Sequence, residues 1–89
     1  MHDPELESLR ALIDSIDEEL VAILARRAAT AVRIGEAKRA LGAKVCDRER
    51  ESAVIQRVLS ANSGPVSNED LQAIYEAIIA ACSHVQQSS

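Results

Sequence analysis

The 89-residue chain has almost no aromatic side chains: Tyr75 is the only one, and tryptophan and phenylalanine are absent. Binding of single-stranded nucleic acid depends on aromatic side chains that stack on bases, so this function is disfavoured. The net charge of −4 and the lack of a compact helix-turn-helix spacing also argue against DNA binding. Strands favour aromatic and β-branched residues, so the composition weakens an all-β interpretation too.

Long apolar runs, glycine-rich phosphate loops and clusters of metal ligands are also missing. No run approaches the roughly 20 residues that span a bilayer, and the polar segment Met1–Glu5 does not resemble a secretory signal. Cys46 and Cys82 lie far apart, with no cluster of other ligand types that would indicate a disulfide or a zinc site. We therefore expect a cytoplasmic protein with free thiols, no membrane association, no metal and no other cofactor.

The residues that are abundant favour helices, and the length allows a single domain over residues 1–89. Apolar positions alternate in steps of three and four from Leu6 to Leu41, which predicts a helix over about residues 5–41, roughly 55 Å long. The predicted seam consists of Leu6, Leu9, Ile13, Ile16, Leu20, Ile23, Arg27, Thr30, Ile34, Ala37 and Leu41. The rest of the chain is too short to cover this seam, so we expect self-association.

Two shorter helices are predicted after the long one. Asp47 is the expected N-cap of a helix that ends near 61–62, and the segment 62–65 is typical of a turn. Ser67 caps the third helix, with Asp70 three residues later as a variant of the capping box. The predicted fold class is therefore all-α, with three helices per chain.

Polar residues interrupt these apolar patterns, beginning with Arg27 in the seam of the long helix. Lys38 follows eleven residues later, which places the two side chains within about 20° in direction and about 16 Å apart along the helix. Two long cations in this arrangement could hold one small anion between them. Arg27 could also pair with an acid or reach out to water, and Lys38 has the same choice.

Arg10 precedes Arg27 by seventeen residues and lies about 25 Å away along the same helix. It cannot share a small site with Arg27 within one chain, although an antiparallel helix pair could bring it to the site of a partner. Taken alone, Arg10 is most simply a solvated surface charge.

The shorter helices carry further polar candidates. Asp47, Arg50 and Glu51 begin the second helix, where capping and acids at the positive helix end explain them most simply. Glu51 shares a face with Ile55 and therefore tends toward burial. Gln86 extends the apolar line of the third helix with an amide, or it frays with the C-terminus.

Taken together, these residues resemble the all-helical chorismate mutase family. The motifs are Leu9-Arg10-x-x-Ile13-Asp14-x-x-Asp17, Leu24-x-x-Arg27, Ile34-Gly35-x-x-Lys38, Asp47-x-x-Arg50-Glu51, Ile78-Ile79 and Gln86. The resemblance runs from about residue 6 to 87. It implies an intertwined, antiparallel helical homodimer with two sites, each built from both chains. It also implies the [3,3] rearrangement of chorismate to prephenate in phenylalanine and tyrosine biosynthesis.

The resemblance assigns roles to individual residues. Arg10 from the partner chain binds one substrate carboxylate and Arg27 binds the other. Lys38 reaches the ether oxygen and a carboxylate, and Gln86 donates a hydrogen bond to the same ether oxygen. The catalytic residues it implies are therefore Lys38, Gln86 and Arg27.

The remaining substrate-binding residues surround the ring hydroxyl. Glu51 and the backbone near Asp47 hold this hydroxyl, and Arg50 orients the cluster. Cys82 stands where the family commonly has a small hydroxyl residue near a carboxylate. A thiol is a weaker hydrogen-bond donor than a hydroxyl, so this position departs from the family pattern.

Two alternatives stay open on the sequence. The same fold serves isochorismate–pyruvate lyases and 4-amino-4-deoxychorismate mutases, although the acids Asp47 and Glu51 match the chorismate mutase pattern. A non-catalytic helical dimer or regulatory module is the alternative from a different class. Docking onto another enzyme of the shikimate pathway is a further possible partnership.

Overall fold

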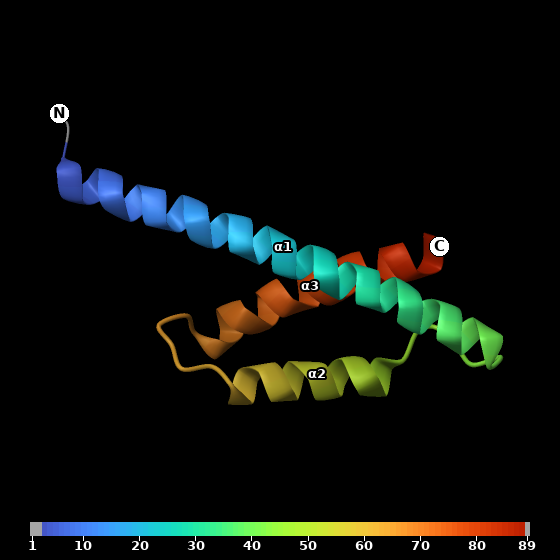
Figure 1. Cartoon of the computed structure of the whole chain (residues 1–89). Helices are drawn as coiled ribbons and strands as arrows, with labels where there is room; N and C mark the ends of the chain where they lie inside the picture. The colour runs from blue at the N-terminus through green and yellow to red at the C-terminus, as the bar shows by residue number, and fades with distance from the viewer. Residues whose placement is uncertain (1–2, 89) are drawn as a thin grey trace.

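The computed structural model describes residues 3–88 and folds them into three helices (Figure 1). Helix α1 is Pro4–Ala40, α2 is Arg48–Ser60 and α3 is Asn68–Ser88. The all-α prediction is confirmed, and the described part of the chain contains no strand. The observed ends of α1 and α2 lie within one or two residues of the predicted ones.

Side-chain caps explain why the helices begin where they do. The Asp3 carboxylate accepts a hydrogen bond from the Glu5 amide at 2.9 Å, with Pro4 at the first helical position. Asp47 caps α2 by accepting from the Arg50 amide at 3.0 Å. The Ser67 hydroxyl caps α3 by accepting from the amide three residues later at 3.1 Å. The caps predicted at Asp47 and Ser67 are therefore confirmed.

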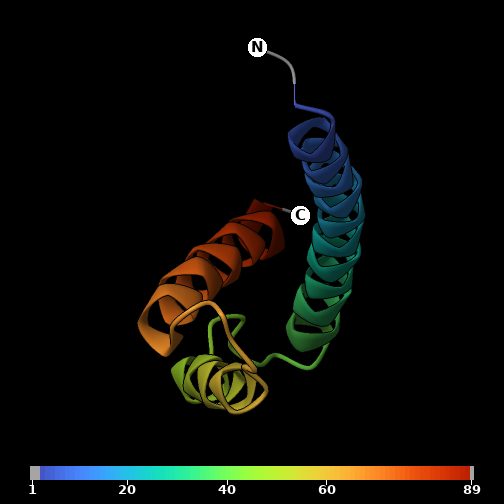
Figure 2. The same cartoon turned by 90° about the vertical axis from the view of Figure 1, so that its left-hand side faces the viewer.

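Helix α3 packs against both α1 and α2, and Figure 2 shows α1 on one side of α3 and α2 below it. Within the single chain, the buried residues in the second half of α1 are Ala31 and Gly35, whereas Thr30 and Ile34 of the predicted seam are exposed. Small side chains let the two helix backbones approach closely, and this determines which face of α1 meets α3. Cys82 on α3 is buried to the same extent as Ala31, with 7% of each exposed.

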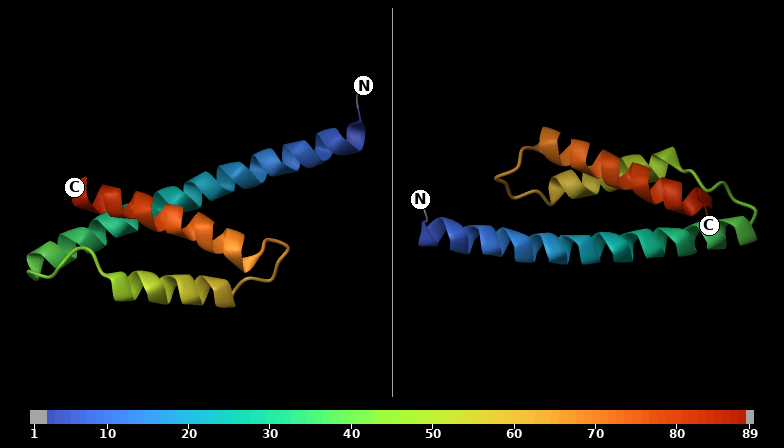
Figure 3. Two further views of the ribbon diagram at one scale, coloured as in Figure 1. Left: turned by 180° about the vertical axis from the view of Figure 1, so that it is seen from behind. Right: turned by 90° about the horizontal axis from the view of Figure 1, so that it is seen from above.

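The N-terminal half of α1 projects beyond the other two helices (Figure 3). Its large apolar side chains are exposed: Leu6, Leu9, Leu12, Ile13, Ile16, Leu20, Val21 and Ile23. We call this surface the α1 stripe.

The dimensions of the chain also show an extended shape. The radius of gyration is 16.9 Å, against about 12 Å for a compact chain of this length. The accessible surface is 7143 Å², against about 5,100 Å² for a folded monomer of this mass. The single chain therefore leaves a large apolar surface uncovered.

Across the described residues, no helix combines the length and the apolar composition that a membrane span requires.

Candidate functional site

A cavity of about 700 Å³ opens between the three helices and the connection from α1 to α2. It brings together seven of the eight residues that the sequence singled out: Arg27, Lys38, Asp47, Arg50, Glu51, Cys82 and Gln86. Six of these residues come from the three helices and Asp47 comes from the connection before α2, so the set spans about sixty positions of the chain. The roles implied for them remain predictions, but their convergence on one cavity is a property of the fold.

Helix α1 contributes Arg27 and Lys38, which line the same cavity as their helical phase predicts. Lys38 is half-buried, and its Nζ donates a hydrogen bond to the carbonyl oxygen of Val45 at 3.1 Å. This bond ties the α1–α2 connection to the cavity wall. An ammonium has three N–H donors, so the bond to Val45 leaves two for a ligand.

Tyr75 on α3 supports Arg27. The Cζ atom of Arg27 lies 5.9 Å from the centroid of the Tyr75 ring, which is within the range of a cation–π interaction. Both residues are half-buried. Helical periodicity alone does not show that α3 places the Tyr75 ring beside a cation of α1.

The first turn of α2 forms another wall of the cavity. The capping bond from the Arg50 amide fixes the Asp47 carboxylate in place. Glu51 follows one turn later and is half-buried, as its position beside Ile55 predicted. The cavity wall therefore includes the Asp47 carboxylate, and the capping hydrogen bond at the start of α2 fixes its direction.

The C-terminal half of α3 supplies Cys82, Ser83 and Gln86. Cys82 is buried and Gln86 is half-buried. Ser83 was not predicted as a site residue, although it follows Cys82 and offers the hydroxyl that Cys82 lacks. The other cysteine, Cys46, is exposed and does not line the cavity.

The charge of the cavity wall is opposite in sign to that of the chain. Arg26 joins the three predicted cations, so four cations face two carboxylates around the cavity, whereas the whole chain carries −4. Arg26 was not predicted as a site residue, although it adjoins Arg27. A net positive cavity suits a small ligand with two carboxylates. Within residues 3–88, no group of three or more His, Cys, Asp or Glu side chains is placed to hold a metal ion.

Arg10 is the predicted site residue that the single chain does not bring into the cavity. It lies exposed on the projecting half of α1, seventeen residues before Arg27. This placement agrees with the expectation that Arg10 cannot share a site with Arg27 of its own chain.

Comparison with known proteins points to one family. A family model described as chorismate mutase type II matches residues 9–87. The chain is 40% identical over 82 residues to the bifunctional chorismate mutase/prephenate dehydratase of Aquifex aeolicus, covering 88% of this chain and 23% of that protein. It is 41% identical over 54 residues to the intracellular chorismate mutase of Mycobacterium tuberculosis, covering 61% of this chain and 51% of that protein. The chain thus spans about a quarter of the length of the bifunctional relatives it matches.

The fold has a close counterpart among solved structures. Chorismate mutase (form II) from Thermus thermophilus superposes with a TM-score of 0.91 at 23% sequence identity. The match covers 93% of this chain and 94% of that one. The long first helix and the two shorter helices are therefore a recurring arrangement.

Proposed function

Because the chain belongs to the type II chorismate mutase family, we propose that it is an isomerase that converts chorismate to prephenate. The observation that carries this proposal is the convergence of Arg27, Lys38, Glu51 and Gln86 on one cationic cavity. A [3,3] rearrangement needs no nucleophile and no proton transfer, so it asks for positioned charges rather than a catalytic triad. The cavity offers such charges from separate helices.

The first task of the site is to hold a flexible dicarboxylate in its compact, reactive conformer. Arg27 is supported by Tyr75 and binds one carboxylate. Lys38, whose ammonium retains two donors, contributes to a carboxylate and to the ether oxygen. The second carboxylate is bound by Arg10 of a second copy of the chain.

The second task is to stabilise the charge that develops as the C–O bond breaks. Lys38 and Gln86 line the same cavity and donate to the ether oxygen, which becomes more negative in the transition state. A preorganised donor of this kind stabilises the transition state by about 3–4 kcal/mol. The rate enhancement then comes from binding the transition state more tightly than the ground state.

The third task is recognition of the ring hydroxyl. Glu51 is half-buried in the cavity wall and accepts from this hydroxyl, together with the backbone at Asp47. Arg50 lies in the same turn and orients the cluster. Cys82 and Ser83 come from α3 on another wall, where the thiol makes the weaker polar contact.

A second copy of the chain completes both the fold and the site. The α1 stripe is exposed in the single chain, and Arg10 lies on the same segment. If two α1 helices pack antiparallel with Arg10 opposite Arg27 of the other copy, the two-fold axis lies near residues 18–19. The stripes then cover one another, and each cavity gains one arginine.

Loss of chorismate absorbance, with identification of the product, is the direct test of this activity. Formation of prephenate from chorismate is the expected result. Salicylate and pyruvate from isochorismate, with chorismate unchanged, would instead support the lyase alternative. Turnover of 4-amino-4-deoxychorismate alone would support the amino-substrate mutase. A dimer without turnover of any of the three substrates would support a regulatory module.

Two further points belong to this proposal. The bifunctional relatives carry a prephenate dehydratase name beside the mutase name, which supports docking of this chain onto another enzyme of the same pathway. One relative is named an intracellular chorismate mutase, in keeping with the cytoplasmic location expected from the sequence.

A further inference from the structure

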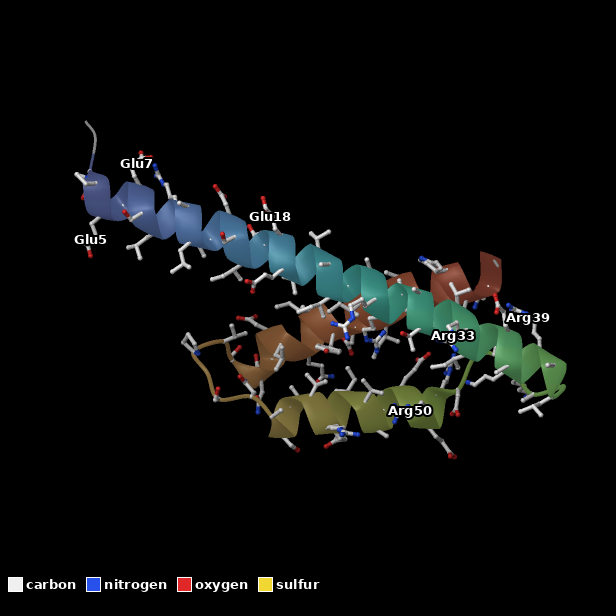
Figure 4. The ribbon with its side chains drawn as sticks, in the orientation of Figure 1. Glu5, Glu7, Glu18, Arg33, Arg39 and Arg50 are labelled. Atoms are coloured by element: carbon white, nitrogen blue, oxygen red, sulfur yellow. The ribbon has the colours of Figure 1, made fainter. Side chains whose placement is uncertain are left out.

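Arg39, in the last turn of α1, joins the C-terminal ends of α1 and α3. Its Nη1 donates a hydrogen bond to the backbone carbonyl oxygen of Gln86 at 3.0 Å, across 47 positions of the chain. Figure 4 labels Arg39 on α1 beside the end of α3. Arg39 does not line the cavity, so its guanidinium contacts the outer side of the turn that carries Gln86.

The end of α3 needs such a donor. The last four carbonyl groups of an α-helix have no partner within the helix, and a positive charge there interacts favourably with the helix dipole. The last turn of α3 contains no basic residue of its own. Arg39 therefore supplies from α1 the cation and the N–H donor that α3 lacks.

Gly35 of α1 faces the side chain of Gln86. A Cβ atom at Gly35 would lie 3.5 Å from both Cβ and Cγ of Gln86, and 3.5 Å from Nη2 of Arg39. The stem of the Gln86 side chain thus lies against the α1 backbone, while its backbone carbonyl is held by Arg39. These two contacts restrict where the amide of Gln86 can point.

We propose that Arg39 is a positioning residue for the reaction, which acts by fixing the last turn of α3 so that the Gln86 amide faces the ether oxygen. This inference rests on the proposed function, because it assigns a purpose to Gln86 within that reaction. Arg39 lies outside the cavity and contributes to kcat through the position of Gln86.

The test is a double-mutant cycle between Arg39 and Gln86, measured by steady-state kinetics with chorismate. We expect Arg39→Leu to lower kcat by about tenfold, which is less than the roughly 10²-fold cost of a 1 Å misplacement, because the contact with Gly35 still restrains the stem of Gln86. KM should change by less than about twofold, because the carboxylate-binding arginines are untouched. Arg39→Lys retains a cationic donor and should recover most of kcat. Arg33→Leu, which removes a charge from an exposed position of the same helix, is the matched control and should leave kcat unchanged.

The Gln86→Ala background separates positioning from general stability. If Arg39 acts through the Gln86 amide, Arg39→Leu should lower kcat by less than about twofold once that amide is gone. An equal loss of kcat in both backgrounds would overturn the proposal, as would a wild-type kcat in Arg39→Leu. If Arg39→Leu does not fold, the neutral Arg39→Gln is measured in its place with the same two outcomes. Absence of turnover in the wild-type chain would overturn the proposed function instead, which is a distinguishable result.

Discussion

Mixing two inactive variants should restore activity if each site takes Arg10 from one chain and Arg27 from the other. Arg10→Ala and Arg27→Ala should each be inactive as homodimers, since each lacks one carboxylate-binding group in both sites. In a mixed dimer, one site contains both wild-type arginines and the other contains neither. Random exchange makes half of the dimers mixed, so the recovered activity should be about one quarter of the wild-type value.

The geometry of α1 determines why a single chain cannot give this result. Seventeen residues separate Arg10 from Arg27, which is about 25 Å along one helix. The cavity that holds Arg27 does not include Arg10 of the same chain. The antiparallel pairing proposed above would bring the two within reach of one small ligand.

A second mixture provides the control. Arg27 and Lys38 line one cavity of one chain, so a mixed dimer of Arg27→Ala and Lys38→Ala has one defect in each site. This mixture should stay inactive after the same exchange procedure. Activity is measured by chorismate consumption, with formation of mixed dimers verified by mass spectrometry. No recovery with the Arg10 and Arg27 variants, or equal recovery in both mixtures, would refute the shared site.

Three further predictions follow from the cavity and the helix contact beside it. Lys38→Ala should lower kcat by about two to three orders of magnitude, while circular dichroism still reports a helical protein; activity near the wild-type level would contradict the role of the ammonium. Gln86→Glu should make turnover depend on pH, with kcat rising as the pH falls toward about 4.3, because only the protonated carboxyl can donate; a flat pH–rate profile would argue against donation from this position. Gly35→Ala should raise the free energy of unfolding by about 0.5–1 kcal/mol in thermal denaturation, because the added Cβ meets Gln86 only at an ordinary contact distance of 3.5 Å. Destabilisation by that variant would mean that the α1–α3 contact is tighter than described.

Helical phase and capping chemistry are local properties, and they were predictable from the sequence. Asp47 and Ser67 were recognised as caps because a side-chain oxygen before a helical pattern satisfies a free amide. Arg27 and Lys38 were expected to share a direction because eleven residues make about three helical turns. Both inferences involve residues of one helix and its first turn, where no knowledge of packing is needed.

Contacts between helices were less predictable. The heptad seam of α1 does not identify the residues that α3 buries, because the backbones approach where Ala31 and Gly35 leave space. The neighbours of Arg27 and Gln86, namely Tyr75 and Arg39, come from other helices. Their distances depend on how α1 and α3 cross, and spacing along the chain carries no information about that crossing.

The surface that the single chain leaves exposed and the residue that its cavity lacks lie on the same stretch of α1. The α1 stripe is apolar and uncovered in the single chain, and Arg10 lies on the same segment of α1. If two copies pair through this stripe, as proposed above, the pairing would bury the apolar residues and bring Arg10 to the neighbouring cavity in the same step. In that arrangement, folding and assembly would be coupled, because the single chain buries only Ala31 and Cys82 among its described apolar residues. The single chain already forms the cavity of about 700 Å³, and the proposed pairing would supply the one predicted site residue that this cavity lacks.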